Sequence, residues 1–153
     1  MIEFQNVSFS YENGDHAGQL HNINFTIPDG QVVLLCGESG CGKTTLTRLL
    51  NGLIPNYYEG RLEGRVFIDG KSIVEKPLYE IASLTGSVFQ NPRSQFFAVD
   101  TNSELAFGCE NLGIAENEII ARMKRTVAEL HIETLMDRSI FALSGGEKQK
   151  IAC

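Results

Sequence analysis

Long apolar runs, a visible export signal and an excess of basic residues are all missing from this chain. The longest apolar runs, such as residues 32–36, are far shorter than the ~20 residues that a transmembrane helix needs. No basic segment leads into a hydrophobic stretch with a cleavage site, the pattern of an exported protein. Lysine and arginine number 13 against 19 aspartates and glutamates, for a formal net charge of −6. We therefore expect a cytoplasmic chain that binds no nucleic acid backbone.

The sequence also has no cysteines or histidines spaced as metal ligands. No C-x-x-C pair occurs, and a cytosolic chain is expected to hold its thiols reduced. Cys41 differs because a nearby helix N-terminus and Lys43 would favour its thiolate; the alternative is a small residue that fills a variable loop position. The residues that predict neither a metal site nor a catalytic pair are Cys36, Cys41, Cys109, Cys153, His16, His21 and His131.

A glycine-rich segment between an apolar run and a helix-forming run is the clearest functional signal. It reads Gly37-Glu38-Ser39-Gly40-Cys41-Gly42-Lys43-Thr44 and matches G-x-x-x-x-G-K-[ST], the phosphate-binding loop or P-loop. Its glycines allow backbone conformations that a Cβ would forbid, so that successive N–H groups can converge on phosphate oxygens. The helix that begins near Lys43 would direct its positive dipole end at the same phosphates. The motif predicts a nucleoside triphosphate and Mg²⁺ as ligands.

The polar side chains of the P-loop have distinct expected roles. Lys43 should reach the β- and γ-phosphates, and the Thr44 hydroxyl should bind Mg²⁺. The alternative interpretation is a glycine-rich turn that happens to contain a lysine. The residues expected to contact the nucleotide here are Gly37, Glu38, Ser39, Gly40, Cys41, Gly42, Lys43, Thr44 and Thr45.

A second motif predicts the start of a helix at residue 144. The segment Leu143-Ser144-Gly145-Gly146-Glu147-Lys148-Gln149 places Glu147 three positions after Ser144, which is the spacing of a capping box. Two glycines at this helix start would let an anion approach the backbone closely. The residues alone leave two interpretations open, an ordinary capped helix and an anion-binding helix start.

Two further residues have both a structural and a functional interpretation. Gln90 precedes Asn-Pro, so it is either a turn residue after a strand or an uncharged amide that accepts from a metal-bound water and donates to a phosphate oxygen. Tyr11 ends an alternating strand and precedes a turn. An aromatic residue in that place is commonly part of the core edge.

These segments, in this order, resemble the nucleotide-binding domains of ABC-type ATPases. Residues 86–92 resemble the Q-loop of that family, and residues 143–149 resemble its signature sequence, with Glu147 where many members have glutamine. Residues 89–97 and 104–112 look like the ATPase subunits of energy-coupling-factor transporters, which import vitamins and transition-metal ions. The resemblance implies an α/β fold: an ABC-type P-loop NTPase with a RecA-like core, an antiparallel β region and a helical subdomain.

The resemblance also implies roles for the candidate residues. Lys43 and Gln90 would be catalytic, Thr44 and Gln90 would bind Mg²⁺, and Tyr11 would stack on the adenine of ATP. The signature residues would bind the γ-phosphate of ATP held by the opposite subunit of a head-to-tail dimer; they are Ser144, Gly145, Gly146 and Glu147.

Domain organisation and partners follow from the same resemblance. Residues 1–90 would form the β region and the P-loop core, residues 91–143 the helical subdomain, and residues 144–153 the start of the signature helix. The partners would be a second ABC ATPase domain, a transmembrane coupling subunit and a substrate-binding membrane subunit. The protein would lie on the inner face of the cell membrane, with residues 93–97 near the coupling subunit.

Later elements of that family are not found in the sequence. No run of four apolar residues followed by Asp-Glu occurs, and His131 precedes the signature, so a catalytic glutamate and a switch histidine are absent. We expect the N-terminal portion of one domain, incomplete at its C-terminus, in which residues 32–36 lose lateral strand pairing. The favoured function is part of an ATP-hydrolysing subunit of an energy-coupling-factor-type importer. The alternatives are a truncated nucleotide-binding module without turnover and, disfavoured by residues 89–112, a soluble non-transport ATPase.

Hydrophobic periodicity and turn residues predict the local structure. Strands are expected over residues 2–11, 19–27, 31–36 and 62–68 and in the segment that ends at Gln90. Helices are expected over residues 43–50, 77–83, 102–111 and 116–136 and from residue 144 onward.

Overall fold

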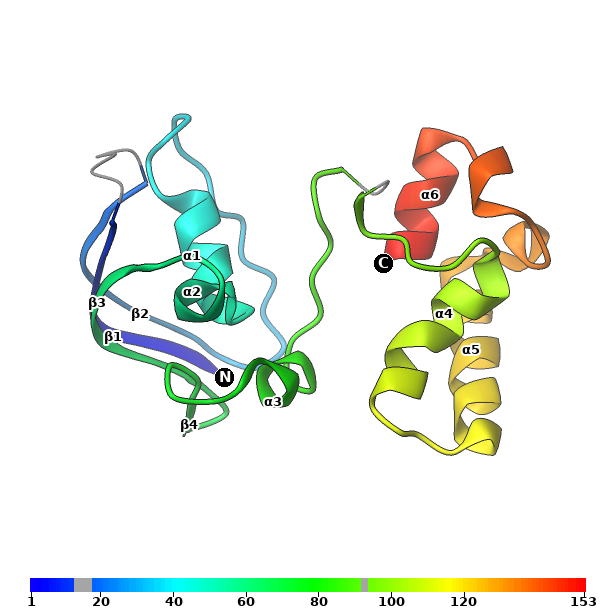
Figure 1. The fold of residues 1–153 in the computed structure, drawn as a ribbon, viewed down its shortest axis with the longest axis horizontal. Helices are drawn as coiled ribbons and strands as arrows, with labels where there is room; N and C mark the ends of the chain where they lie inside the picture. The colour runs from blue at the N-terminus through cyan, green and yellow to red at the C-terminus, as the bar shows by residue number, and fades with distance from the viewer. Residues whose placement is uncertain (13–17, 92–93) are drawn as a thin grey trace. The chain divides into compact units, whose positions relative to one another are not determined.

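The computed structural model describes residues 1–12, 18–91 and 94–153, and the chain divides into two units, Met1–Gly86 and Ser87–Cys153. The first unit contains an antiparallel sheet with short helices, and the second is helical (Figure 1). Each unit has its own apolar core.

The sheet of the first unit has four antiparallel strands in the order β2-β1-β3-β4. Their bounds are Ile2–Tyr11 for β1, Leu20–Ile27 for β2, Gly60–Ile68 for β3 and Lys71–Ser72 for β4. The buried residues of β1 are Phe4, Val7 and Phe9, a spacing that departs from strict alternation. The departure coincides with an irregularity in the pairing of β1 with β3, which inserts an extra residue and returns Val7 to the buried face.

Three short helices complete the first unit: α1 (Lys43–Leu50), α2 (Leu53–Asn56) and α3 (Leu78–Ala82). One apolar residue from each, Leu49, Ile54 and Ile81, is buried in the cluster that the sheet residues Phe4, Phe9, Val66 and Ile68 also form. The sheet core therefore fixes the direction in which α1, which begins directly after the P-loop, points its N-terminus.

The second unit consists of α4 (Thr101–Asn111), α5 (Glu116–Leu130), the 3₁₀ helices η2 (Glu133–Leu135) and η3 (Ile140–Ala142), and α6 (Gly145–Ala152). Helices α4 and α5 lie side by side (Figure 1). The core contains Ile132, Leu135, Leu143 and Ile151, with Phe96, Leu105 and Val127 packed against it. No helix among the described residues is long and apolar enough to span a membrane.

Most of the expected elements are confirmed within one or two residues at each end. These are the strands expected over 2–11, 19–27 and 62–68, the helices expected over 43–50, 77–83 and 102–111, and the helix expected from residue 144. Helix α1 has the bounds that the sequence predicted. Both signals are local: the glycines of the P-loop precede the helix, and the apolar residues follow at helical spacing.

The expected strand over residues 31–36 is wrong. The described residues there form no strand, and Val32 and Leu34 are 101% and 85% exposed. A strand requires a neighbour for its N–H and C=O groups, and none of the described strands lies beside this segment. The expected loss of lateral pairing is thereby confirmed: the apolar run is present, but the strands that would pair with it are not among the described residues.

Two other expectations also need correction. The segment that ends at Gln90 forms no strand, and its apolar residues Val88 and Phe89 are exposed, again without a described neighbouring strand. The helix expected to continue to residue 136 ends at Leu130, because His131 adopts a left-handed conformation with φ of 52° and sends the chain into the core at Ile132.

Candidate functional site

The P-loop leads into α1 through a glycine that no other residue could replace without strain. Gly42 occupies the N-cap of α1 with φ of 96°. A Cβ built there would lie 2.8 Å from the Leu20 Cδ2 atom and 3.3 Å from the Gln19 carbonyl oxygen. Both the backbone conformation and the close approach of β2 therefore require glycine at this position. Strand β2 thus helps to set the loop against the N-terminus of α1.

Lys43 folds back over its own loop. Its Nζ atom donates to the carbonyl oxygens of Gly37 at 2.8 Å and Glu38 at 2.6 Å, and it lies 3.4 Å from the Cys41 Sγ atom. An ammonium group is thereby held at the mouth of a loop whose residues, from Gly37 to Cys41, are all exposed. Because this charge also lies at a helix N-terminus, the site combines two features that favour an anion.

The two threonines that follow Lys43 differ in their surroundings. Thr44 is exposed, so its hydroxyl is accessible to a ligand. Thr45 is buried, and its Oγ1 atom lies 3.0 Å from the Tyr11 hydroxyl, which also accepts from the Arg48 Nη1 atom at 3.0 Å. The structure therefore brings Tyr11 to the first turn of α1, directly after the P-loop.

The ring of Tyr11 is itself part of the packing of the first unit. It meets Phe9 and Tyr58 edge to face, with centroid distances of 4.8 and 6.3 Å. The Arg48 guanidinium lies 3.8 Å above the Tyr58 ring and completes this cluster. Tyr11 therefore lies at the edge of the core and also next to the P-loop. Its stacking on adenine stays a prediction.

Gln90 belongs to the second unit, whereas Thr44, the other expected Mg²⁺ ligand, belongs to the first. Gln90 is exposed and lies at a bend, after residues that form neither helix nor strand. The neighbouring Phe89 N–H donates to the Gln95 Oε1 atom at 3.0 Å, and the Gln95 Nε2 atom donates to the Ala152 carbonyl oxygen at 3.1 Å. Gln95, which the sequence did not single out, thus links the Gln90 segment to the end of α6.

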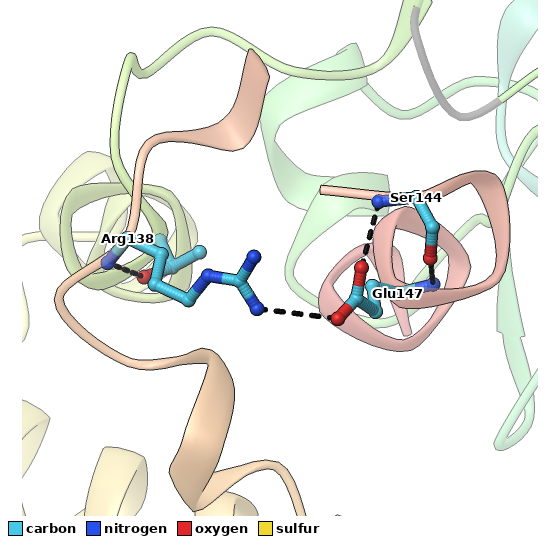
Figure 2. A network of polar contacts seen from close by, with 4 residues as sticks. Arg138, Ser144 and Glu147 are labelled. Carbon is cyan, nitrogen blue, oxygen red and sulfur yellow. Dashed lines mark hydrogen bonds and ion pairs between the residues drawn. The ribbon is translucent and has the colours of Figure 1, made fainter. Parts of the chain in front are cut away.

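The expected capping box at the start of α6 is confirmed (Figure 2). The Glu147 N–H donates to the Ser144 Oγ atom at 3.3 Å, and the Ser144 N–H donates to the Glu147 Oε2 atom at 2.7 Å. Gly145 and Gly146 lie between them, and a Cβ at either would meet no atom within 4 Å. The helix start therefore leaves open space beside its backbone, as an approaching anion requires.

Arg138 is a residue of this region that the sequence did not reveal. Its Nη1 atom lies 3.2 Å from the Glu147 Oε1 atom in an ion pair, shown in Figure 2. The Arg138 backbone is fixed at the N-terminus of α4, because its N–H donates to the Thr101 Oγ1 atom and its carbonyl accepts from the Thr101 N–H. The pair joins segments nine residues apart, and no helical spacing in the sequence signals it.

Replacing Glu147 with glutamine is expected to remove a pH-dependent contribution to stability. The hydrogen bonds with Ser144, and then the Arg138 charge, hold the pKa of the Glu147 carboxyl below its ordinary value of 4.5. A carboxyl whose pKa is lowered by folding stabilises the protein above its unfolded pKa, and this is lost as the pH falls through the folded pKa. Urea unfolding should therefore give a higher free energy of unfolding for wild type than for E147Q at pH 7. The two free energies should converge as the pH falls well below 4.5.

The matched control for that experiment is Glu129→Gln on the exposed surface of α5. Glu129 has no ion pair among the described residues, so its replacement should change the unfolding free energy at pH 7 less than E147Q does. A constant offset between wild type and E147Q at every pH would show that the carboxylate contributes no charge-dependent stability.

All four cysteines are free thiols, with Cys41 exposed in the P-loop. Within the described ranges, no group of three or more histidine, cysteine, aspartate or glutamate residues is placed to hold a metal ion. The candidate site residues therefore fall into two groups, one around the P-loop in the first unit and one around the start of α6 in the second.

Known proteins share both the sequence and the fold of this chain. Residues 20–153 match the family model described as ABC transporter. A putative ABC transporter ATP-binding protein of Treponema denticola is 52% identical over 152 residues, which cover 99% of this chain and 31% of that protein. A similarly named protein of Pyrococcus abyssi is 41% identical over 99% of this chain and 55% of its own length. The chain thus spans about a third of the T. denticola relative and about half of the P. abyssi one.

Two solved structures have the same fold. The structure of cbiO1 from Clostridium perfringens, described as part of the ABC transporter complex cbiONQ, superposes with a TM-score of 0.83 at 30% identity, over 99% of this chain and 58% of that one. A dimeric ATP-binding cassette bound to ADP and Pi superposes with a TM-score of 0.75 at 22% identity, over 99% of this chain and 67% of that one. Because the family model covers most of the chain and the fold agrees, this chain belongs to the ABC transporter family and has the fold of its ATP-binding domains.

Proposed function

We propose that this chain is the nucleotide-binding part of an ATP-hydrolysing subunit that powers an energy-coupling-factor-type importer. The observation that carries the proposal is the Lys43 ammonium, held over the P-loop by two loop carbonyls at the N-terminus of α1. The likeness to cbiO1, which is part of a cbiONQ transporter complex, supports the type of transporter.

The residues around the P-loop fit ATP and Mg²⁺ as ligands. Gly42 leaves no room for a Cβ, Lys43 presents a positive charge, and Thr44 presents an exposed hydroxyl. In this proposal Lys43 moves from the loop carbonyls to the β- and γ-phosphates, while Thr44 and Gln90 bind the metal ion. Mg²⁺ supplies neutralisation of the phosphate charge when bound. Tyr11 stacks on the adenine from the edge of the sheet.

The signature residues act on a second ATPase domain. The capping box holds Ser144 and the open backbone of Gly145 and Gly146 at the start of α6, with Glu147 fixed by Arg138. A helix start with free backbone N–H groups is a general anion site. We propose that it binds the γ-phosphate of ATP held by the opposite domain of a head-to-tail dimer.

Hydrolysis belongs, in this proposal, to the complete polypeptide. Phosphoryl transfer to water requires a group that orients the water, and no residue of this chain matches the catalytic glutamate of the family. A second candidate function is nucleotide binding without turnover by the chain itself. The exposure of Val32 and Leu34, beside the P-loop, favours this candidate for the isolated chain.

The proposed partners are a second ABC ATPase domain, a transmembrane coupling subunit and a substrate-binding membrane subunit. The proposed location is the cytoplasmic face of the membrane. Residues 93–97, beside Gln90, are the proposed contact with the coupling subunit. Among the described residues of this segment, Phe97 is 74% exposed and stacks on Phe107 with a centroid distance of 4.8 Å, so it presents a fixed apolar surface.

Replacing Phe97 with alanine is expected to weaken assembly with the membrane subunits by about tenfold, the effect of removing an aromatic anchor worth about 1–2 kcal/mol. ATP affinity should not change, because the P-loop belongs to the other unit. Phe97 is replaced and Phe96 is kept, because Phe96 packs against the core of the second unit. The measurement is the amount of membrane subunit that co-purifies with the complete polypeptide.

Leu112→Ala provides the matched control, because Leu112 is an exposed apolar residue beyond the other end of α4. It should leave co-purification at the wild-type level. If wild type itself recovers no membrane subunit, the transporter assignment fails; if F97A and wild type recover equal amounts, only the contact through Phe97 fails.

A further inference from the structure

A negative charge at the start of α6 opposes the anion-binding role proposed for this helix start. Glu147 lies in the first turn, and the hydrogen bonds with Ser144, and then the Arg138 charge, hold its pKa below the ordinary 4.5, so the carboxyl is ionised at pH 7. A carboxylate in this place repels a phosphate and offsets the positive end of the helix dipole. Glutamine also closes a capping box, so the helix start itself does not require the charge. Anion binding here therefore requires a cation that cancels the charge of Glu147.

Arg138 is the cation that lies beside this carboxylate. Its Nη1 atom is 3.2 Å from the Glu147 Oε1 atom, while the Glu147 Oε2 atom accepts from the Ser144 N–H at 2.7 Å (Figure 2). Each carboxylate oxygen thus has its own partner. An arginine side chain stays protonated in proteins, so the pair carries no net charge. The two side chains are 38% and 32% exposed, so dissolved salt reaches the pair.

Backbone contacts fix the position from which the Arg138 side chain extends. The Arg138 N–H donates to the Thr101 Oγ1 atom at 3.3 Å, and its carbonyl oxygen accepts from the Thr101 N–H at 3.0 Å. Thr101 is fully buried at the start of α4. The preceding Asp137 has φ of 56°, and its N–H donates to the Asn102 Oδ1 atom at 3.1 Å. A residue with a Cβ keeps this uncommon conformation where its surroundings hold it. The guanidinium is therefore held beside Glu147 by a fixed stretch of backbone.

The backbone groups available to an anion lie within the same helix start. The first intrahelical hydrogen bond of α6 runs from the Lys148 N–H to the Ser144 carbonyl oxygen at 2.9 Å, so the N–H groups of Gly145 and Gly146 precede it. We propose that Arg138 is a positioning residue of the signature. By neutralising and holding the Glu147 carboxylate, it allows these two N–H groups to bind the γ-phosphate held by the opposite domain. The inference rests on the function proposed above for the signature residues.

The test compares two nucleotides that differ in the γ-phosphate. The affinities of the complete polypeptide for ADP and for adenylyl imidodiphosphate, an ATP analogue that resists hydrolysis, are measured by isothermal titration calorimetry with Mg²⁺. Arg138→Met is expected to weaken binding of the analogue about fivefold and to leave ADP binding unchanged, because the uncompensated carboxylate then repels the γ-phosphate. Arg138→Lys keeps the charge and should retain most of the wild-type ratio between the two affinities.

Two further readouts distinguish a charge effect from a merely structural one. In the background of Glu147→Gln, which leaves no charge to cancel, Arg138→Met should cause no further loss, as a double-mutant cycle would show. In R138M alone, the loss should shrink as the NaCl concentration rises to about 1 M, because salt screens the repulsion. A loss caused by disturbed packing would persist in both cases, and that result would overturn the inference.

The controls separate the role of Arg138 from the anion site itself. Arg122→Met also removes an arginine paired with a glutamate of the second unit, Glu118 at 2.8 Å, and should change neither affinity. Gly145→Asp adds a second negative charge where a Cβ has open space. If G145D keeps the wild-type ratio of affinities, the proposed role of the signature fails, and the inference fails with it. If G145D loses the ratio but R138M keeps it, only the role of Arg138 is overturned.

Discussion

Replacing Lys43 with alanine is expected to lower the affinity of the complete polypeptide for ATP by about a hundredfold, or about 3 kcal/mol. The ammonium that would bind two phosphates is lost. The contacts of 2.8 and 2.6 Å between Lys43 and the carbonyl oxygens of Gly37 and Glu38 are exchanged for the phosphates in this proposal, so their loss does not add to the effect. Isothermal titration calorimetry with Mg²⁺ and ATP measures the change, with circular dichroism as the check that the fold persists.

Lys71→Ala is the control for the loss of a positive charge, because Lys71 is an exposed lysine of β4 in the same unit. It should leave ATP affinity within twofold of wild type. ATP binding of wild-type strength in folded K43A would remove the P-loop from the nucleotide site. An equal loss in K71A would mean that net charge, and not the position of Lys43, governs binding.

Elements whose signals lie within a few residues could be predicted from the sequence. Helix α1 begins after Gly42, and α6 begins at a capping box whose two hydrogen bonds the spacing of Ser144 and Glu147 predicted. Both starts depend on local backbone geometry, which the residue types at the cap determine. The same holds for β1, β2 and β3, where apolar residues and turn residues mark the ends of each strand.

Elements that depend on a distant partner could not be predicted in this way. Residues 32–35 have the composition of a buried strand, yet they are exposed because no described strand pairs with them. The end of α5 was missed for a different reason: His131 takes φ of 52° without the glycine that commonly marks such a helix end. Apolar residues continue past Leu130 because Ile132, directly before η2, and Leu135, within η2, are both buried in the core of the second unit.

The candidate sites show the same division. The P-loop motif identified Lys43, but the contacts of Tyr11 with Thr45 and Arg48 come from side chains more than thirty positions apart. Neither the Arg138 pair with Glu147 nor the burial of Lys148 follows from the signature motif, since both depend on how the second unit folds. The motifs therefore predicted which residues form the candidate sites, whereas the side-chain contacts around each motif required the structure.

Replacing Gly64 with alanine is expected to destabilise the first unit by at least about 3 kcal/mol. Losses of this size in the unfolding free energy are typical of substitutions that disrupt the core or the backbone. Gly64 lies in β3 opposite the irregular stretch of β1, with φ of 84°. A Cβ there would lie 2.3 Å from the Asn6 carbonyl oxygen and 2.5 Å from the Asn6 carbonyl carbon. These are backbone atoms, so relief requires the two central strands to separate, which would also displace the buried Val7.

Gly70→Ala separates this clash from the cost of a left-handed backbone. Gly70 has φ of 72°, close to that of Gly64, but a Cβ there would meet no atom within 4 Å. Its replacement should cost about 1 kcal/mol, the ordinary penalty of that conformation for a residue with a Cβ. The difference between the unfolding free energies of the two variants, measured in urea, therefore gives the cost of the clash between β3 and β1. Equal losses would mean that β1 can shift away from β3 at little cost, and that the irregular pairing at Asn6 does not fix the register of the sheet.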